Sequence, residues 1–426
     1  MTDAELTPDP AGHQKPRFSL IGPGLVVAAT GVGAGDLVAA LVAGERYGHT
    51  LLWAAVVGCV IKLFLAEGVG RFTFASGRTL FDGWASLGRW ASVYFGAYII
   101  IWGLVYGAAG MTAAGLPLAA LFPVLPLKAW AALCGVAGLI FVWFNRYAVF
   151  EKVMAGLTAV MFVTVVGLAI LSAPSLPEVL RGLIPTAPAG SALYVLGLIG
   201  GVGGTITMAA YGYWLNAKGW HGPEQIPAMR LDNRVAYAAT GVFVLAMLIV
   251  GAQLLYASGV ALKGGDRGLL DLAEVLEARF GQPVAMMFLI GFFATAFTSV
   301  IGVWQGVSLL FADFFAHVME QTAKKPGDGR APVRGEGSPA FRGYMLWLTF
   351  APMPLLFLDR PYALVLAYGV LGALFMPFLA TTLLWLLNSN QTPRAWRNGW
   401  VSNAGLLAAT VLFVALGLNE VVKSLG

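Results

Sequence analysis

Eight long stretches without a charged side chain constrain the fold of this chain more than any other feature. They cover residues 18–35, 91–127, 153–177, 182–217, 235–262, 280–312, 361–393 and 398–419. An α-helix of about 20 apolar residues crosses the hydrocarbon core of a bilayer, and most of these stretches are that long. Only 11% of all residues are Asp, Glu, Lys or Arg, whereas a soluble domain carries about 25%. Lipid is therefore the main solvent of this chain.

The apolar stretches lack the alternating pattern of barrel strands. Since only helices and closed barrels satisfy their backbone hydrogen bonds in lipid, we predict an all-α polytopic membrane protein. Gly, Pro and charged residues divide the sequence into about eleven transmembrane helices. The predicted spans are 20–44, 49–72, 92–116, 128–145, 150–173, 191–216, 234–258, 282–312, 343–358, 361–388 and 399–420.

The charged residues between the spans predict the orientation in the membrane. Lysine and arginine are more frequent in the segments that share a side with the N-terminus, so we expect a cytoplasmic N-terminus and an external C-terminus. Residues 1–17 are polar and are expected to form a disordered cytoplasmic tail. The segment 317–342 is rich in Gly, Pro and charge, which predicts a flexible cytoplasmic linker.

The N-terminal sequence and the positions of the basic residues predict where the protein is located and which partners it has. With no organellar transit pattern, the plasma membrane of a prokaryote is the expected location. The basic side chains lie at the ends of spans, where they suit lipid headgroups, and we expect no nucleic-acid partner. The oligomeric state is left open.

Two glycine-dense segments interrupt predicted helices five spans apart. They are Gly31-Val32-Gly33-Ala34-Gly35 in the first span and Gly200-Gly201-Val202-Gly203-Gly204 in the sixth. Breaks at corresponding positions of two five-span halves indicate a secondary transporter built from inverted repeats. The repeats would cover 18–173 and 191–388, with 398–420 as an additional helix. The alternative is that these glycines only allow helices to pack closely.

Four charged residues fall inside the first two predicted spans, namely Asp36, Lys62, Glu67 and Arg71. Asp36 follows the first glycine segment, and a carboxylate at membrane depth marks a functional site by default. The alternative is a structural ion pair with Lys62 in the second span. Lys62 and Glu67 are candidates for a counter-ion or a proton relay, while Glu67 is also placed to pair with Arg71, four residues later.

Several segments resemble the Nramp family of divalent-metal transporters. The stretch GPGLVVAATGVGAGDLVAALVAGERYG (22–48) is similar to the family's first helix, and GTITMAAYGYWLN (204–216) to its sixth. GFFATAFTSVIGVWQGVSLLFADF resembles the eighth helix, and ALVLAYGVLGALFMPFLATTLLWLLN the tenth. The resemblance covers roughly 20–390 and implies the fold of the amino-acid/cation symporters, in which helices 1 and 6 are broken.

At the positions that hold the metal in this family, this sequence has different residues. The family's Asp-Pro-Gly-Asn motif falls on Gly33, Ala34, Gly35 and Asp36, so one carboxylate is lost and an acid replaces the amide. The Met-Pro-His motif of the sixth helix falls on Met208, Ala209 and Ala210, and its carbonyl ligand on Thr205. A glutamine of the tenth helix falls on Gly369. The resemblance thus implies a metal site made of Asp36, Gly33, Thr205 and Met208.

This ligand set predicts the substrate class. Carboxylate, carbonyl and water ligands suit Mg²⁺, Ca²⁺ and Mn²⁺, while a thioether favours softer ions. Because a branch related to the Nramp family transports magnesium, the resemblance implies Mg²⁺ and Mn²⁺ as the leading candidates. We therefore expect secondary-active transport of a divalent metal ion, with no resident cofactor. Alternatively, the same fold carries a small organic solute or a monovalent ion, with Asp36 as charge partner or proton carrier. A sensor or an enzyme is disfavoured because the sequence has no nucleophile motif and no His/Cys cluster.

Overall fold

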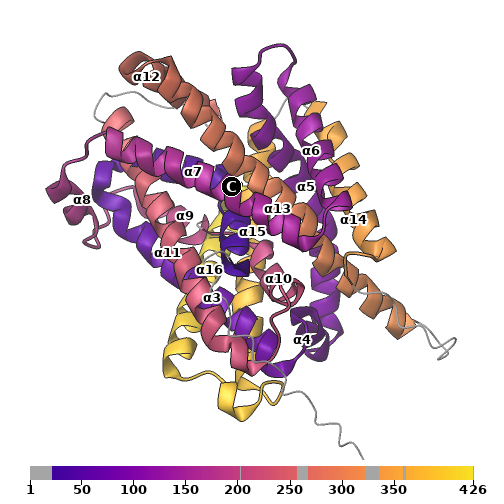
Figure 1. The fold of residues 1–426 in the computed structure, drawn as a ribbon. Coiled ribbons are helices and arrows are strands. Elements are labelled where there is room, and N and C mark those ends of the chain that lie inside the picture. Colours follow the sequence, from indigo (N-terminus) through magenta and orange to yellow (C-terminus); the bar gives the residue numbers. More distant parts are fainter. Residues whose placement is uncertain (1–21, 202, 257–266, 323–334, 358–360, 426) are drawn as a thin grey trace, which may run out of the picture.

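The computed structural model of the chain describes residues 22–201, 203–256, 267–322, 335–357 and 361–425. Within these ranges the regular secondary structure is helical and no β-strand is formed. Figure 1 shows the helices gathered in one bundle, with the short helix α12 at one end and α4 at the other. The prediction of an all-α fold is confirmed.

The first half of the chain forms the first five predicted spans. The first span is split in two, and short helices follow the second and fifth spans. The helices are α1 (Pro23–Gly31), α2 (Ala34–Tyr47), α3 (Leu52–Ser76), α4 (Leu80–Ser86), α5 (Arg89–Leu121), α6 (Leu127–Phe144), α7 (Tyr147–Leu171) and α8 (Leu176–Gly182).

The second half begins with another split helix, in which a 3-10 turn, η2 (Ile206–Ala210), separates the two parts. One short helix, α12, lies between the seventh and eighth spans. The helices are α9 (Ala192–Gly201), α10 (Tyr211–Ala217), α11 (Ile226–Gly251), α12 (Arg267–Phe280), α13 (Gln282–Thr322), α14 (Pro339–Phe350), α15 (Pro361–Asn388) and α16 (Trp400–Leu425). Each predicted span overlaps helix in its described residues, although α14 ends at Phe350, inside the predicted span 343–358.

Length and composition define the membrane-crossing helices. Within the described residues, six helical stretches are long and apolar enough to span a bilayer, and two shorter apolar helices cover 374–388 and 400–415. Large apolar side chains on outward faces stay exposed, for example Val163 at 65% and Ile170 at 71% on α7. Such faces are stable in lipid. The chain is a polytopic helical membrane protein.

The predicted linker 317–342 is corrected at both ends. Helix α13 continues to Thr322 and α14 begins at Pro339, while 323–334 lie outside the described residues. The helix extends because residues 313–322 contain neither Gly nor Pro. Ser338 starts α14, since its side chain accepts the Phe341 N–H. The predicted tail 1–17 also lies outside the described residues.

Glycines let the helices around the first break approach at backbone distance. A methyl group on Gly44 of α2 would overlap the Leu248 carbonyl oxygen, and one on Gly251 of α11 would overlap that of Leu41. This reciprocal contact fixes α2 against α11. At the start of α1, the backbone N–H of Gly24 donates to Asp232 Oδ2 on α11 at 2.6 Å. Helix α11 therefore holds both parts of the broken first helix.

Candidate functional site

The first helix breaks at the residues predicted from its glycines. Helix α1 ends at Gly31, Val32 is extended with ψ 91°, and Gly33 is extended with ψ −175° before α2 begins. Ser299 on α13 donates its hydroxyl to the free Thr30 carbonyl at 2.9 Å, and Tyr106 on α5 lies 2.7 Å from Ser299 Oγ. Neighbouring helices thus supply the hydrogen bonds that the break removes.

The sixth helix breaks between α9 and η2. Gly203 and Gly204 have φ values of +82° and +98°, in the left-handed region that glycine adopts without strain. Tyr237 on α11 places its hydroxyl 3.4 Å from the Gly203 carbonyl oxygen. Val202 lies outside the described residues. The break is built into the backbone conformation of these two glycines.

The two breaks touch each other through their glycines. A methyl group added to Gly204 would lie 2.9 Å from Gly31 Cα, and one added to Gly31 would lie 2.6 Å from Gly204 N. Real side chains are not found at such distances, so only glycine permits this crossing. The structure therefore brings together the two segments that the sequence placed five spans apart.

Lys62 reaches the sixth-helix break from α3. Its side chain is fully buried, and Nζ donates to the carbonyl oxygen of Gly204. The same Nζ lies 3.9 Å from Met376 Sδ on α15 and 5.3 Å from the ring centroid of Phe413 on α16. A carbonyl of the break thus faces a cation that belongs to the protein itself.

The structure locates the predicted metal ligands as follows. Met208 is fully buried in η2, and its backbone N–H donates to the Thr205 carbonyl oxygen at 3.1 Å. Gly33 directly precedes α2 beside Ser299 Oγ, since a methyl group on Gly33 would lie 3.2 Å from that oxygen. The backbone of Asp36 lies in the first turn of α2, whereas its side chain is outside the described residues. Gly369 lies within α15.

In the described part of the chain, side-chain metal ligands do not cluster at any other place. Among the described residues, no group of three or more His, Cys, Asp or Glu is arranged to hold a metal ion. Cys59 and Cys134 are buried, separate thiols.

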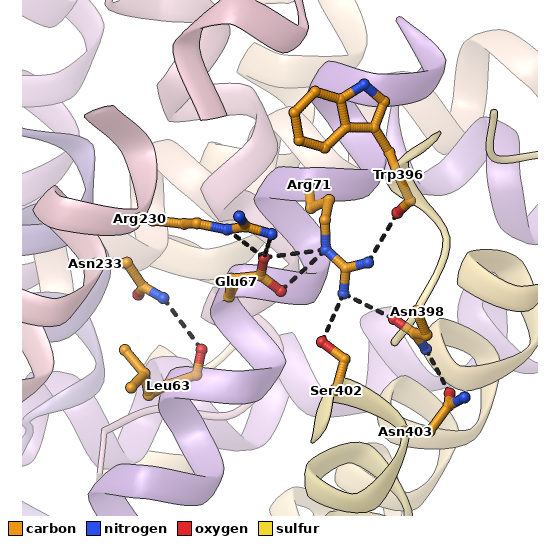
Figure 2. A network of polar contacts seen from close by, with 9 residues as sticks. All are labelled: Leu63, Glu67, Arg71, Arg230, Asn233, Trp396, Asn398, Ser402 and Asn403. Atoms are coloured by element: carbon orange, nitrogen blue, oxygen red, sulfur yellow. Dashed lines mark hydrogen bonds and ion pairs between the residues drawn. The ribbon is translucent and has the colours of Figure 1, made fainter. Parts of the chain in front are cut away.

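Glu67 belongs to a network of polar contacts that Figure 2 shows. Its carboxylate pairs with Arg71 Nε at 3.0 Å on the same helix and with Arg230 of α11 at 2.9 Å. Arg71 also donates to the Trp396 carbonyl at 2.8 Å and to Asn398 Oδ1 at 2.7 Å. The network joins α3, α11 and the segment that leads into α16.

Sequence reasoning missed the residues that complete the site. Ser299, Tyr106 and Tyr237 are neutral hydroxyls inside apolar spans, and such residues are common in membrane helices. Arg230 and Asp232 stand just before the predicted seventh span, where basic and acidic residues ordinarily mark a span end. Their roles depend on contacts with residues far away in the sequence.

This chain is a helical membrane protein in which two discontinuous helices cross. Such an architecture is typical of secondary transporters and not of enzymes. The sequence profile of the Nramp family, described as "Natural resistance-associated macrophage protein-like", matches residues 24–423. The chain belongs to the Nramp family, whose members are transporters.

Known relatives and solved structures agree with this membership. The divalent metal cation transporter MntH of Mycobacterium tuberculosis is 25% identical over 320 residues, which cover 72% of this chain and 73% of that protein. MntH of Klebsiella pneumoniae is 26% identical over 303 residues, covering 68% and 70%.

The solved structures show the fold. A manganese transporter of Eremococcus coleocola aligns with a TM-score of 0.76 at 17% identity, covering 98% of this chain and 90% of the other. A Na⁺-coupled sialic acid symporter aligns with a TM-score of 0.55 at 12% identity, covering 95% and 90%.

Proposed function

We propose that this chain carries divalent metal ions across a membrane by alternating access, with Mg²⁺ and Mn²⁺ as the favoured ions. The observation that carries the proposal is the contact of Gly31 with Gly204, which joins the two helix breaks at one point. Residue 36 lies in the first turn of α2, five residues after Gly31. The names of the MntH relatives support the substrate class.

The proposed ligands are the Asp36 carboxylate, the carbonyls of Gly33 and Thr205, and the Met208 sulfur. The Thr205 carbonyl already accepts one hydrogen bond, and a carbonyl oxygen has a second lone pair for a cation. With one carboxylate, the ion would keep several of its waters, which Mg²⁺ tolerates because it dehydrates reluctantly. Participation of Met208 would shift the preference toward Mn²⁺.

The halves 18–173 and 191–388 are proposed to be the inverted repeats. The position of the short helices supports this division. Helix α4 follows the second span and α12 follows the seventh, so each half carries a short helix at the corresponding place. They lie at opposite ends of the bundle in Figure 1, as an inverted repeat requires. We further propose a prokaryotic plasma membrane with the N-terminus inside.

A second candidate keeps the fold and replaces the substrate by a small organic solute or a monovalent ion. The buried ammonium of Lys62 at the sixth-helix break favours it, because a fixed positive charge repels a divalent cation more than a neutral or anionic solute. In this case Asp36 would balance charge or carry a proton.

Isothermal titration of the purified protein with Mg²⁺, Mn²⁺ and Ca²⁺ tests the proposal, together with uptake into proteoliposomes. Asp36→Ala should abolish binding and uptake because it removes the side-chain ligand, while Glu274→Gln, which neutralises an exposed acid on α12, should leave both unchanged. Uptake of a metal ion by the Asp36→Ala protein at the wild-type rate would refute the metal site. Binding of organic solutes alone would favour the second candidate.

A further inference from the structure

Lys62 places a basic side chain at the sixth-helix break, at a depth where membrane proteins ordinarily exclude charge. Its side chain is fully buried in the middle of α3, and a charged group at membrane depth is costly unless it is well solvated by the protein. A buried lysine in a transporter core therefore requires an explanation from its contacts.

The contacts of Nζ have the chemistry of a cation site. It donates to the Gly204 carbonyl oxygen, lies 3.9 Å from the Met376 sulfur and faces the Phe413 ring at 5.3 Å. A carbonyl dipole, a polarisable thioether and an aromatic face each attract positive charge. They come from the sixth-helix break, α15 and α16, so three separate elements meet at this ammonium.

The position of this ammonium relates it to the proposed metal site. Gly204 directly precedes Thr205, one of the proposed ligands, and its backbone touches Gly31 at the first break. The other two charged residues of α3, Glu67 and Arg71, pair with each other, and Glu67 also pairs with Arg230 of α11. The positive charge of Lys62 therefore acts where the two breaks cross.

We propose that Lys62 is a tethered cation that holds the sixth-helix break and determines which charge the transport site accepts. This inference rests on the proposed function and deepens it. The Coulomb repulsion between the ammonium and a bound ion scales with the charge of that ion. Lys62 thus weakens divalent binding about twice as strongly, on a logarithmic scale, as monovalent binding, and it keeps the divalent site at low affinity.

The first test uses isothermal titration with divalent ions to separate the effect of the charge at residue 62 from the effect of the side-chain shape. Lys62→Met keeps a similar length and removes the charge, and Lys62→Arg keeps the charge. We expect Lys62→Met to bind Mn²⁺ and Mg²⁺ on the order of tenfold more tightly than wild type. Lys62→Arg should stay close to wild type. Unchanged divalent affinity in a folded Lys62→Met protein would overturn the proposal.

The second test does not depend on the substrate. Lys62→Ala removes the ammonium and most of its stem, so n-propylammonium should fill the space and raise the thermal unfolding temperature of the variant. The neutral n-propanol should give a smaller shift, and the wild type should show none from either compound. If the amine and the alcohol shift the unfolding temperature equally, or if neither shifts it, the space left by the Lys62 side chain does not select a cation.

The two tests separate the two proposals. If neither the wild type nor Lys62→Met binds a divalent ion, the proposed function fails and the role of Lys62 in selecting substrate charge fails with it. Rescue by the amine would then still establish a cation site at the sixth-helix break. If divalent ions bind equally well with and without the charge at residue 62, the metal transporter stands and the tethered cation is refuted.

Discussion

Tyr213 donates its phenolic hydroxyl to Asp313 Oδ2 at 2.6 Å, which ties the second part of the broken sixth helix to α13. Thr79, the N-cap of α4, donates to the same oxygen at 2.6 Å. A single carboxylate oxygen on α13 thus joins two elements, α10 and α4. Since α10 is the second part of the discontinuous sixth helix, this contact restrains that part of the helix against α13.

Tyr213→Phe should loosen α10 without changing its packing. The variant removes one hydrogen bond to a buried charge, which is worth about 1.5 to 3 kcal/mol. We expect a lower thermal unfolding temperature and faster hydrogen exchange in α10. Thr79→Val, which removes the other donor, should instead affect α4. Identical exchange in α10 before and after Tyr213→Phe would show that this bond does not restrain the helix.

Glu67→Gln distinguishes a structural ion pair from a proton relay. Neutralising Glu67 leaves Arg71 and Arg230 without their shared carboxylate, so the free energy of unfolding should fall by about 1 to 3 kcal/mol. A second substitution, Arg230→Gln, should recover part of that loss, because it removes one of the two stranded charges. A thermal denaturation series of the single and double variants measures this coupling.

A relay would behave differently. If Glu67 carried protons, Glu67→Gln would abolish pH-driven uptake while the unfolding temperature stayed the same. That result would contradict the structural role that its two arginine contacts indicate.

Gly31→Ala should prevent the crossing of the two breaks. Its methyl group would lie 2.6 Å from Gly204 N, so the backbone of one break must shift. We expect loss of transport together with a lower unfolding temperature. Gly156→Ala on α7 is the matched control, since nothing lies within 4 Å of the added methyl group. This control should gain about 0.5 to 1 kcal/mol from its better helix propensity. Full transport by Gly31→Ala would mean that the contact is not required.

Asp232→Asn should free the start of α1. The carboxylate accepts the Gly24 N–H at 2.6 Å, and a negative charge at a helix N-terminus is favourable. The amide keeps the shape and weakens the bond, so we expect a loss of about 0.5 to 2 kcal/mol. Hydrogen exchange of the α1 amides should rise while that of α2 serves as internal control. Unchanged exchange in α1 would show that other contacts hold this end.

The predicted breaks were found where the sequence placed them because their cause is local. Gly203 and Gly204 adopt positive φ values that other residues rarely reach, and the first break consists of two extended residues, Val32 and Gly33. The linker boundary was wrong for a related reason. Residues 317–322 were assigned to the linker on the composition of the whole segment, although nothing within them ends a helix.

The candidate site was predictable in part. The resemblance pointed to Gly33, Thr205 and Met208, and these residues lie at the breaks. Their ligand roles remain proposals, as does that of Asp36. The i+4 pairing of Glu67 with Arg71 followed from helix geometry, whereas the Arg230 contact, 163 residues away, did not.

The sequence by itself determined an all-α membrane protein with discontinuous first and sixth helices, because helix formation in lipid and left-handed glycines obey rules that act within a few residues. The tertiary structure alone decided what the polar groups of those helices meet. Lys62 reaches a carbonyl 142 residues away, and Tyr213 reaches an acid 100 residues away. Such partners depend on how whole helices pack, and no local pattern specifies which of several buried polar groups will face each other.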